Sequence, residues 1–267
     1  DQTFNLDTSL IEKKITKKTK AILAVHLFGH PAEMSTILRL ARKYKLKVIE
    51  DCAEAHGAEY NGKKVGSFGD AGCFSLYANK IISTGEGGLI TFNSTKYYKK
   101  AKNLKELAFG TKNKFMHQDI GYNYRMTNLQ AAIGCAQMNK IKYILQKKIR
   151  IANMYDKYLS SNNLITRPYT KENVKNVYWM YCVSIPKFKK SLRKKIMQKL
   201  LTKGIETRDM FIPCNLQSVF LKKRLFKSNE CPKANVVAYN SFYLPSGVEL
   251  REKDIKYICK ELNNLVR

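Results

Sequence analysis

The stretch from Val48 to Gly88 reads VIEDCAEAHGAEYNGKKVGSFGDAGCFSLYANKIISTGEGG. It holds a carboxylate directly after an apolar run (Asp51), a hydroxyl shortly before a lysine (Ser75 and Lys80) and a glycine-rich turn at its end. An enzyme that uses pyridoxal phosphate needs an anion for the pyridinium nitrogen, a donor for the phosphate and an amine that holds the cofactor covalently. The stretch therefore offers one candidate for each of these contacts.

Short apolar runs before this stretch predict a parallel α/β unit. Residues 21–25 (AILAV) and 46–49 (LKVI) are expected to be strands, and the apolar spacing within residues 34–44 predicts a helix between them. Strand, helix and strand with short connections are typical of a parallel sheet. Because ligands bind beyond the carboxyl ends of such strands, we expect Asp51 to lie at a site.

The rest of the chain predicts further elements and a second domain. From Pro168 onward the sequence pattern changes, with an aromatic strand followed by a basic helix. We place the domain boundary inside or just after the long helix expected at residues 128–160, which gives domains 1–150 and 151–267. Strands are expected at residues 72–76, 89–92 and 177–185, and helices at residues 94–107, 128–160, 190–203 and 254–266, with a further amphipathic segment at residues 10–19.

The chain is strongly basic, with 49 Lys and Arg against 21 Asp and Glu in 267 residues, a net charge of +28. The lysines are scattered along the chain, and several adjacent pairs lie where helical faces should meet solvent. We therefore favour solvated helix faces over nucleic-acid binding, and we expect no nucleic-acid partner. Attraction of a small anionic substrate is the remaining interpretation of the charge.

Seven dispersed cysteines without a CxxC pair indicate reduced thiols, with no disulfide framework and no metal site. No apolar run approaches the length of a membrane span. The first residues, DQTFNLDTSL, lack the basic start and apolar centre of a signal peptide. We therefore expect a cytoplasmic protein without a membrane partner.

Each candidate residue also has a structural interpretation. Asp51 alone could cap a helix or form an ion pair, Lys80 alone could be a surface lysine, and Ser75 could be a small core residue. The context favours function, because the short apolar segment FSLYAN presents Lys80 from a strand end. The glycines of residues 83–88 would also let the backbone approach a flat ligand.

Several motifs in the same order resemble the DegT/DnrJ/EryC1/StrS family of sugar aminotransferases, which are fold-type I pyridoxal-phosphate enzymes. The motifs lie at residues 49–88, 19–34 (TKAILAVHLFGHPAEM), 121–134 (GYNYRMTNLQAAIG), 204–208 (GIETR), 211–213 (FIP) and 243–247 (YLPSG). The resemblance covers nearly the whole chain. It implies an α/β large domain with a mostly parallel, here incomplete, sheet over residues 1–150, and a small α+β domain over residues 151–267.

The resemblance implies roles for individual residues. Lys80 matches the lysine that holds the cofactor covalently, Asp51 the acid that bonds the pyridine nitrogen, and Ser75 the phosphate-binding hydroxyl. Glu54 stands beside the cofactor's 3-hydroxyl, where many members have Gln, and a carboxylate there needs a donor opposite it. Asn123 matches an asparagine that reaches the phosphate from the neighbouring subunit, which implies a homodimer with shared active sites.

The resemblance is greatest to the perosamine synthase branch, which aminates C4 of a nucleotide-linked 4-keto-6-deoxyhexose with glutamate as the amino donor. His56, His117 and Arg208 could line the sugar-nucleotide pocket, although either histidine could be a structural imidazole. A 3-keto-sugar aminotransferase on a dTDP or UDP carrier is the nearest alternative. A dehydratase is disfavoured, because such members replace the lysine at Lys80 with histidine. A non-catalytic relic or a basic binding protein is the alternative from another class.

The motif DQTFNLD at residues 1–7 lies well inside the large domain in this family. In those proteins a Ser/Thr-rich helix start that cradles the cofactor phosphate precedes it. We therefore expect this chain to be truncated at its N-terminus and, alone, to bind pyridoxal phosphate weakly or not at all.

Overall fold

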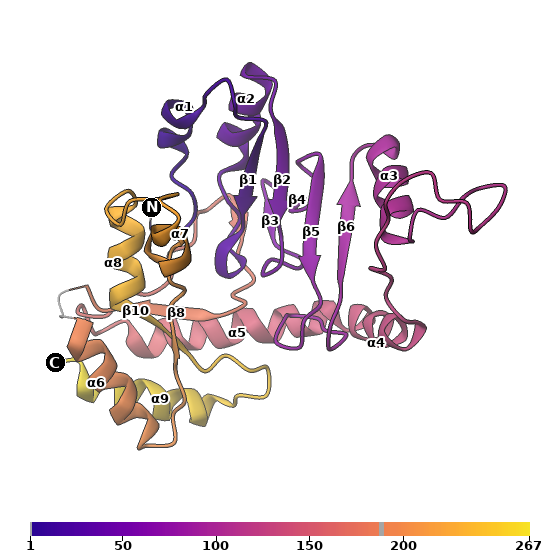
Figure 1. Cartoon of the computed structure of the whole chain (residues 1–267). Helices are drawn as coiled ribbons and strands as arrows, with labels where there is room; N and C mark the ends of the chain where they lie inside the picture. The colour runs from indigo at the N-terminus through magenta and orange to yellow at the C-terminus, as the bar shows by residue number, and fades with distance from the viewer. Residues whose placement is uncertain (1, 187–189) are drawn as a thin grey trace. The chain divides into compact units, whose positions relative to one another are not determined.

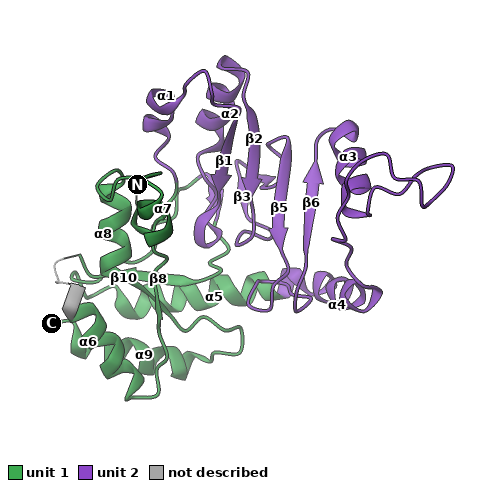
Figure 2. Cartoon of the chain, viewed as in Figure 1, with its two compact units in different colours: residues 1–5, 144–172, 176–267 green, residues 6–143, 173–175 purple. Residues whose placement is uncertain are grey.

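The computed structural model describes residues 2–186 and 190–267 and divides the chain into two compact units (Figure 2). Unit 2 comprises residues 6–143 and 173–175, and unit 1 comprises residues 1–5, 144–172 and 176–267. The expected division into domains 1–150 and 151–267 stays a prediction.

Unit 2 is built on a four-stranded sheet in the order β1-β2-β5-β6 (Figure 1). The strands are β1 (Ala21–Val25), β2 (Lys47–Asp51), β5 (Ala71–Ser75) and β6 (Gly88–Phe92), all four close to the expected ranges. β1, β2 and β5 run parallel, whereas β6 pairs antiparallel with β5. The α/β fold class is confirmed, with a sheet that is mixed because a turn returns the chain directly from β5 to β6.

Helix α2 (Met34–Lys43) packs its apolar side against this sheet. Met34, Ile37 and Leu40 are buried on one side of the helix, in one cluster with Ile22 and Val48 of β1 and β2. Full burial of each such side chain stabilises the fold by about 1.5–3 kcal/mol. The remaining elements of unit 2 are η1 (Thr8–Leu10), α1 (Ile11–Lys14), η2 (Leu27–Gly29), β3 (Glu59–Tyr60), β4 (Lys63–Lys64), α3 (Thr95–Lys105), α4 (Asn128–Asn139) and β7 (Val174–Lys175).

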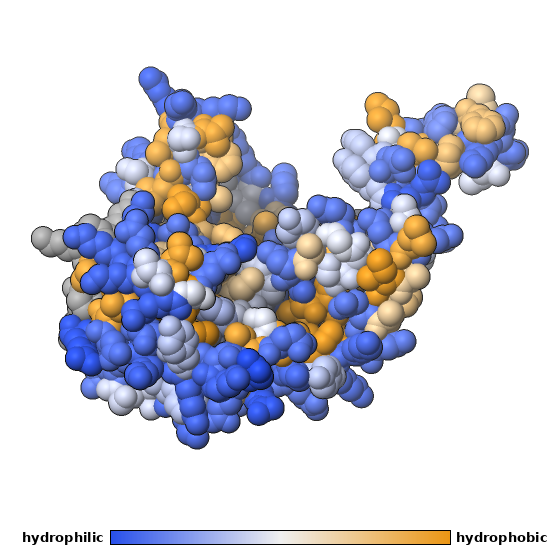
Figure 3. Space-filling view, turned by 90° about the horizontal axis from the view of Figure 1, so that it is seen from below, coloured by the Kyte–Doolittle hydropathy of each residue, from blue (hydrophilic) through white to orange (hydrophobic). Residues whose placement is uncertain are grey.

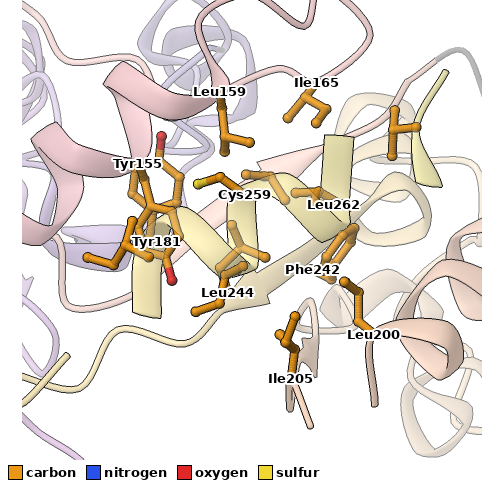
Figure 4. Packing of buried hydrophobic residues seen from close by; sticks show 14 of the residues in the cluster. Tyr155, Leu159, Ile165, Tyr181, Leu200, Ile205, Phe242, Leu244, Cys259 and Leu262 are labelled. Carbon is orange, nitrogen blue, oxygen red and sulfur yellow. The ribbon is translucent and has the colours of Figure 1, made fainter. Parts of the chain in front are cut away.

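Unit 1 combines a three-stranded antiparallel sheet, in the order β8-β10-β9, with helices, an α+β arrangement as expected. Its core gathers side chains of helices and strands, among them Tyr155 and Tyr181, whose stacked ring centroids lie 4.7 Å apart (Figure 4). The elements are α5 (Ile141–Leu159, which starts in unit 2), β8 (Tyr181–Ser184), α6 (Lys190–Leu201), β9 (Arg208–Asp209), η3 (Cys214–Leu216), α7 (Ser218–Lys222), α8 (Pro232–Asn240), β10 (Ser241–Leu244) and α9 (Glu252–Leu265).

Three expected elements differ from the structure. The single helix at residues 128–160 is divided at Lys140, whose N–H bonds back to Gln137 and Met138 instead of continuing the α-helical pattern. The strand at residues 177–185 is shortened to β8, because Tyr178 adopts a left-handed φ of 48°. The segment at residues 10–19 is helical only over η1 and α1. In the described part of the chain, no helix combines the length and apolar character needed to cross a membrane.

Candidate active site

Asp51 ends β2, where the carboxyl ends of the parallel strands β1, β2 and β5 meet at one edge of the sheet. Its register partners are Val25 and Cys73. Its Oδ1 accepts a hydrogen bond from the Ala53 N–H at 3.0 Å. The half-buried carboxylate is thus held at the edge where ligands bind in parallel sheets.

Lys80 follows β5 in a tight turn, where its N–H bonds to the Tyr77 carbonyl at 2.9 Å. Its side chain is only 13% exposed, and its Nζ lies 4.0 Å from Oε1 of Glu54. Burial lowers the pKa of Lys80, and the charges of Glu54 and Asp51 oppose that shift. A lowered pKa favours the neutral amine, the form that acts as a nucleophile.

Glu54 lies in the turn after β2 and is buried. Its Oε2 accepts a hydrogen bond of 2.7 Å from the backbone N–H of Phe28, which has a left-handed φ of 58° in η2. Burial raises the pKa of Glu54 to about 7, and the Phe28 N–H and the Lys80 charge oppose the shift. This donor is a backbone group, so no residue type in the sequence marks it.

Ser75 ends β5, and its hydroxyl accepts a hydrogen bond from the Tyr77 N–H at 3.2 Å. The turn that follows is tied by its own hydroxyls: Ser83 accepts from the Gly85 N–H, and Thr84 donates to the Glu86 carbonyl. A Cβ at Gly87, where φ is 143°, would lie 2.8 Å from the Thr84 hydroxyl. The turn is therefore closely packed at that position.

His56 is a buried imidazole in the same unit, 5.4 Å from the Phe74 ring between centroids. Neither ring nitrogen of His56 forms a hydrogen bond with the described residues. The Ser75 backbone is nevertheless close enough to affect the pKa of His56. Burial, followed by the Lys80 charge, lowers the pKa of His56 to about 4. The imidazole is therefore neutral at physiological pH.

Glu50 is a fully buried carboxylate that the sequence did not single out for function. It accepts hydrogen bonds of 2.8 Å each from the N–H groups of Gly66, Phe68 and Gly69, and lies 3.1 Å from Nε2 of His26. Because Nδ1 of His26 accepts from a backbone N–H, Nε2 is the donor to Glu50. Burial opposes ionisation, but these hydrogen bonds lower the pKa of Glu50. A carboxylate in an apolar strand was the available signal for this network.

His26, Glu50 and Cys52 bring possible metal-ligand atoms within 4.8 Å of one another. Both ring nitrogens of His26 and both carboxylate oxygens of Glu50 already take part in hydrogen bonds. We therefore assign the group to the scaffold that holds the ends of β1 and β2.

Three residues that the sequence predicted for the site make no contact with Asp51, Ser75 or Lys80 in the interactions of the described residues. Asn123 is exposed, forms an isolated bridge with Glu106 and accepts from Arg125 at 3.4 Å. His117 is exposed, with Nδ1 2.7 Å from the Leu107 carbonyl. Arg208 belongs to unit 1, where its guanidinium lies 3.4 Å from Glu206.

The side chains of Asp51, Ser75 and Lys80 have the functional groups that pyridoxal phosphate requires. Asp51 offers a carboxylate for the pyridine nitrogen, Lys80 a buried amine with a lowered pKa, and Ser75 a hydroxyl at the end of the adjacent strand. The unpaired nitrogens of His56 add buried polar atoms close to Lys80.

The sequence matches the DegT/DnrJ/EryC1/StrS aminotransferase family over residues 1–263. It is 39% identical to the GDP-perosamine synthase of Escherichia coli O157:H7 over 98% of this chain and 70% of that protein. It is 36% identical to the GDP-perosamine synthase of Caulobacter vibrioides over 99% of this chain and 71% of that protein. The fold matches Helicobacter pylori PseC, an aminotransferase of pseudaminic acid biosynthesis, with a TM-score of 0.94 and 26% identity, over 100% of this chain and 72% of that one.

Proposed function

Because this chain belongs to the DegT/DnrJ/EryC1/StrS aminotransferase family, a family of transferases, we propose that it aminates a nucleotide-linked 4-keto-6-deoxyhexose. The amino donor is glutamate, the cofactor is pyridoxal phosphate and the reaction is that of a perosamine synthase. The observation that carries the proposal is the grouping of Asp51, Ser75 and Lys80 at the carboxyl edge of one sheet.

Pyridoxal phosphate, when bound, supplies an electron sink that stabilises negative charge on a carbon of the donor or the sugar. Asp51 would keep the pyridine nitrogen protonated by accepting its hydrogen bond. Ser75 would donate its hydroxyl to the phosphate, and Glu54 would face the ring hydroxyl. Lys80 would hold the cofactor covalently, and its amine would be released when the amino donor takes its place.

The displaced Lys80 amine is then the group that moves a proton within the site. A general base must be neutral to accept a proton, and the burial that lowers the pKa of Lys80 favours that state. With the cofactor bound, the Lys80 amine would take the proton from the α-carbon of glutamate and pass it to the cofactor carbon that receives the amino group. In the second half of the reaction it would take a proton from that same carbon and deliver it to C4 of the sugar.

The substrate assignment is supported by the relatives named GDP-perosamine synthase, which align with almost the whole chain. The net charge of +28 suits a nucleotide sugar, because a basic protein attracts a diphosphate through its electrostatic field. His56, His117 and Arg208 remain our candidates for residues that line the sugar-nucleotide pocket.

We also propose that the protein works as a cytoplasmic homodimer in which Asn123 contributes to the partner's site. Figure 3 shows apolar side chains among hydrophilic ones on one face of the protein. In unit 2, several large apolar residues close to Asn123 in the sequence are exposed and would be covered by a second copy. These residues are Phe115, Met116, Ile120, Tyr124 and Leu129.

The proposal is tested with purified chain, added pyridoxal phosphate, glutamate and a GDP-linked 4-keto-6-deoxyhexose. We expect the 4-amino sugar as product, detected by mass spectrometry and located at C4 by NMR. A Lys80→Ala variant should lose both half-reactions, because it lacks the amine that moves the proton, with at least roughly a 100-fold fall in rate. A matched Lys142→Ala variant, which changes an exposed lysine of α5, should keep the activity.

Two results would contradict specific parts of the proposal. If only 3-keto sugars on a dTDP or UDP carrier are aminated, the substrate assignment is wrong. If Lys80→Ala transaminates at a rate close to wild type, the role of Lys80 is wrong.

A further inference from the structure

The side chains of Glu54 and Lys80 face each other and are largely shielded from solvent. Oε1 of Glu54 lies 4.0 Å from Nζ of Lys80, and the two side chains are 10% and 13% exposed. At this separation two charges interact more strongly in a protein interior than in water. The charge of each group therefore depends on the charge of the other.

The Glu54 carboxyl is fixed in this position by its second oxygen. Oε2 accepts a hydrogen bond of 2.7 Å from the Phe28 N–H, in a turn where Phe28 and Gly29 both have positive φ. A carboxyl that rotated away would leave that buried N–H unpaired, which is unfavourable. Oε1 consequently stays directed toward Lys80.

The other titratable groups that act on this pair are Asp51 and His56. Asp51 adds a second negative charge that acts on both Lys80 and Glu54. His56 has a pKa lowered to about 4, so it carries no charge near neutral pH. With its pKa raised to about 7, Glu54 is the carboxyl beside Lys80 that gains or loses its charge near neutrality.

We propose that Glu54 is a positioning residue that sets the charge of Lys80. Its carboxylate stabilises the ammonium, and its neutral carboxylic acid removes that stabilisation, so that Lys80 more readily becomes the free amine. An amide at this position could not change its charge and could not exert this control. The catalytic consequence rests on the proposed function, whereas the coupling is a property of the chain itself.

The experiment measures the reactivity of the Lys80 amine in the full chain without added cofactor. Brief exposure to acetic anhydride at a series of pH values, followed by peptide mass spectrometry, gives the acylation rate of Lys80 in wild type and in Glu54→Gln. At about pH 8.5 we expect Lys80 to react about tenfold faster in the variant, which corresponds to a pKa lower by one unit. At about pH 5, where Glu54 is protonated, the two rates should agree.

The variants separate the charge from the fold. Glu54→Gln keeps a carbonyl oxygen to accept the Phe28 N–H, so its melting temperature should stay close to wild type. Glu54→Ala removes that acceptor and should be less stable, yet show the same faster acylation. Glu12→Gln removes an exposed pair with Lys43 in the same unit and should leave the Lys80 profile unchanged.

Equal Lys80 acylation rates in wild type and Glu54→Gln at every pH would overturn the proposal. A separate titration with pyridoxal phosphate, followed by the visible absorbance of the lysine-bound cofactor, reports on the proposed function. If the acylation rates differ but wild type shows no such absorbance even at a high concentration of pyridoxal phosphate, the coupling stands and the proposed cofactor role fails for this chain.

Discussion

Two buried charged side chains of this protein, Glu50 and Lys148, are stabilised mainly by backbone groups. Glu50 accepts three backbone N–H groups and one neutral imidazole. In unit 1, Lys148 of α5 is buried, and its ammonium donates to the carbonyls of Trp179 and Ser246 at 2.8 and 2.7 Å. Such buried charges connect segments that are far apart in sequence, but removing each charge from water lowers the stability of the fold.

Lys148 should make stability depend on alkaline pH. Burial lowers its pKa from 10.5 to about 8, so between these values the unfolded chain binds more protons than the folded one. Stability must then rise with pH across this window. We expect the free energy of unfolding of wild type, relative to Lys148→Met, to increase by about 2–3 kcal/mol from about pH 7.5 to about pH 10.5.

Chemical denaturation at each pH gives these free energies. Lys142→Met, which changes an exposed lysine of the same helix, should show no such dependence relative to wild type. Parallel pH profiles for wild type and Lys148→Met would contradict the assignment.

At the scale of elements, the turn at residues 66–69 packs onto the sheet where β5 has a glycine. Glu50 holds this turn from β2, and Gly72 is the register partner of Glu50 on β5. A Cβ at Gly72 would lie 2.4 Å from Cα of Gly66 and 2.7 Å from its carbonyl oxygen. The close approach of turn and strand therefore depends on the absence of a side chain at Gly72.

Gly72→Ala should destabilise unit 2, because its methyl group meets two backbone atoms of Gly66, which cannot rotate away, as well as the Thr91 hydroxyl. We expect a loss of about 1–3 kcal/mol in the free energy of unfolding. Gly247→Ala is the matched control, since no atom lies within 4 Å of the Cβ that it adds. Thermal and urea unfolding give both values, and equal stability of the two variants would show that the turn can move.

The sequence predicted elements with strong local patterns better than those that depend on neighbours. The apolar runs of β1 and β2 and the periodicity of α2 were sufficient to place them. The division at Lys140 and the short β8 were missed, because each depends on a local backbone conformation that apolar periodicity does not encode.

The candidate site was predictable to the same degree. Asp51, Ser75 and Lys80 could be named because they lie at or just after strand ends in one short stretch of sequence. The Phe28 N–H that holds Glu54 is a backbone group and has no residue type to mark it. The roles of Asn123, His117 and Arg208 stay predictions.

At the scale of the whole molecule, the net charge of +28 should govern the capture of an anionic substrate. Many of the lysines that supply this charge lie on exposed faces of helices such as α3, and salt screens such charges. The electrostatic contribution therefore belongs to the encounter with the substrate and should affect KM more than kcat.

We expect KM for the nucleotide sugar to rise several-fold when the ionic strength increases from about 0.05 M to about 0.5 M, with little change in kcat. Steady-state kinetics at a series of salt concentrations measure both constants. Sucrose at matched osmolality, which does not screen charge, should leave KM unchanged. A KM that is independent of salt would rule out electrostatic attraction of the substrate.

The short strand β7 has a practical consequence for dividing this protein into fragments. Val174 and Lys175 pair with β3, and the Asn173 carbonyl accepts a hydrogen bond from the Asn61 N–H at 2.8 Å. These three residues belong to unit 2, although residues 144–172, which precede them in the chain, belong to unit 1. An expression fragment that ends at residue 143 would leave the outer edge of β3 without its partner strand. A fragment intended to reproduce unit 2 therefore has to carry residues 173–175 on a designed linker.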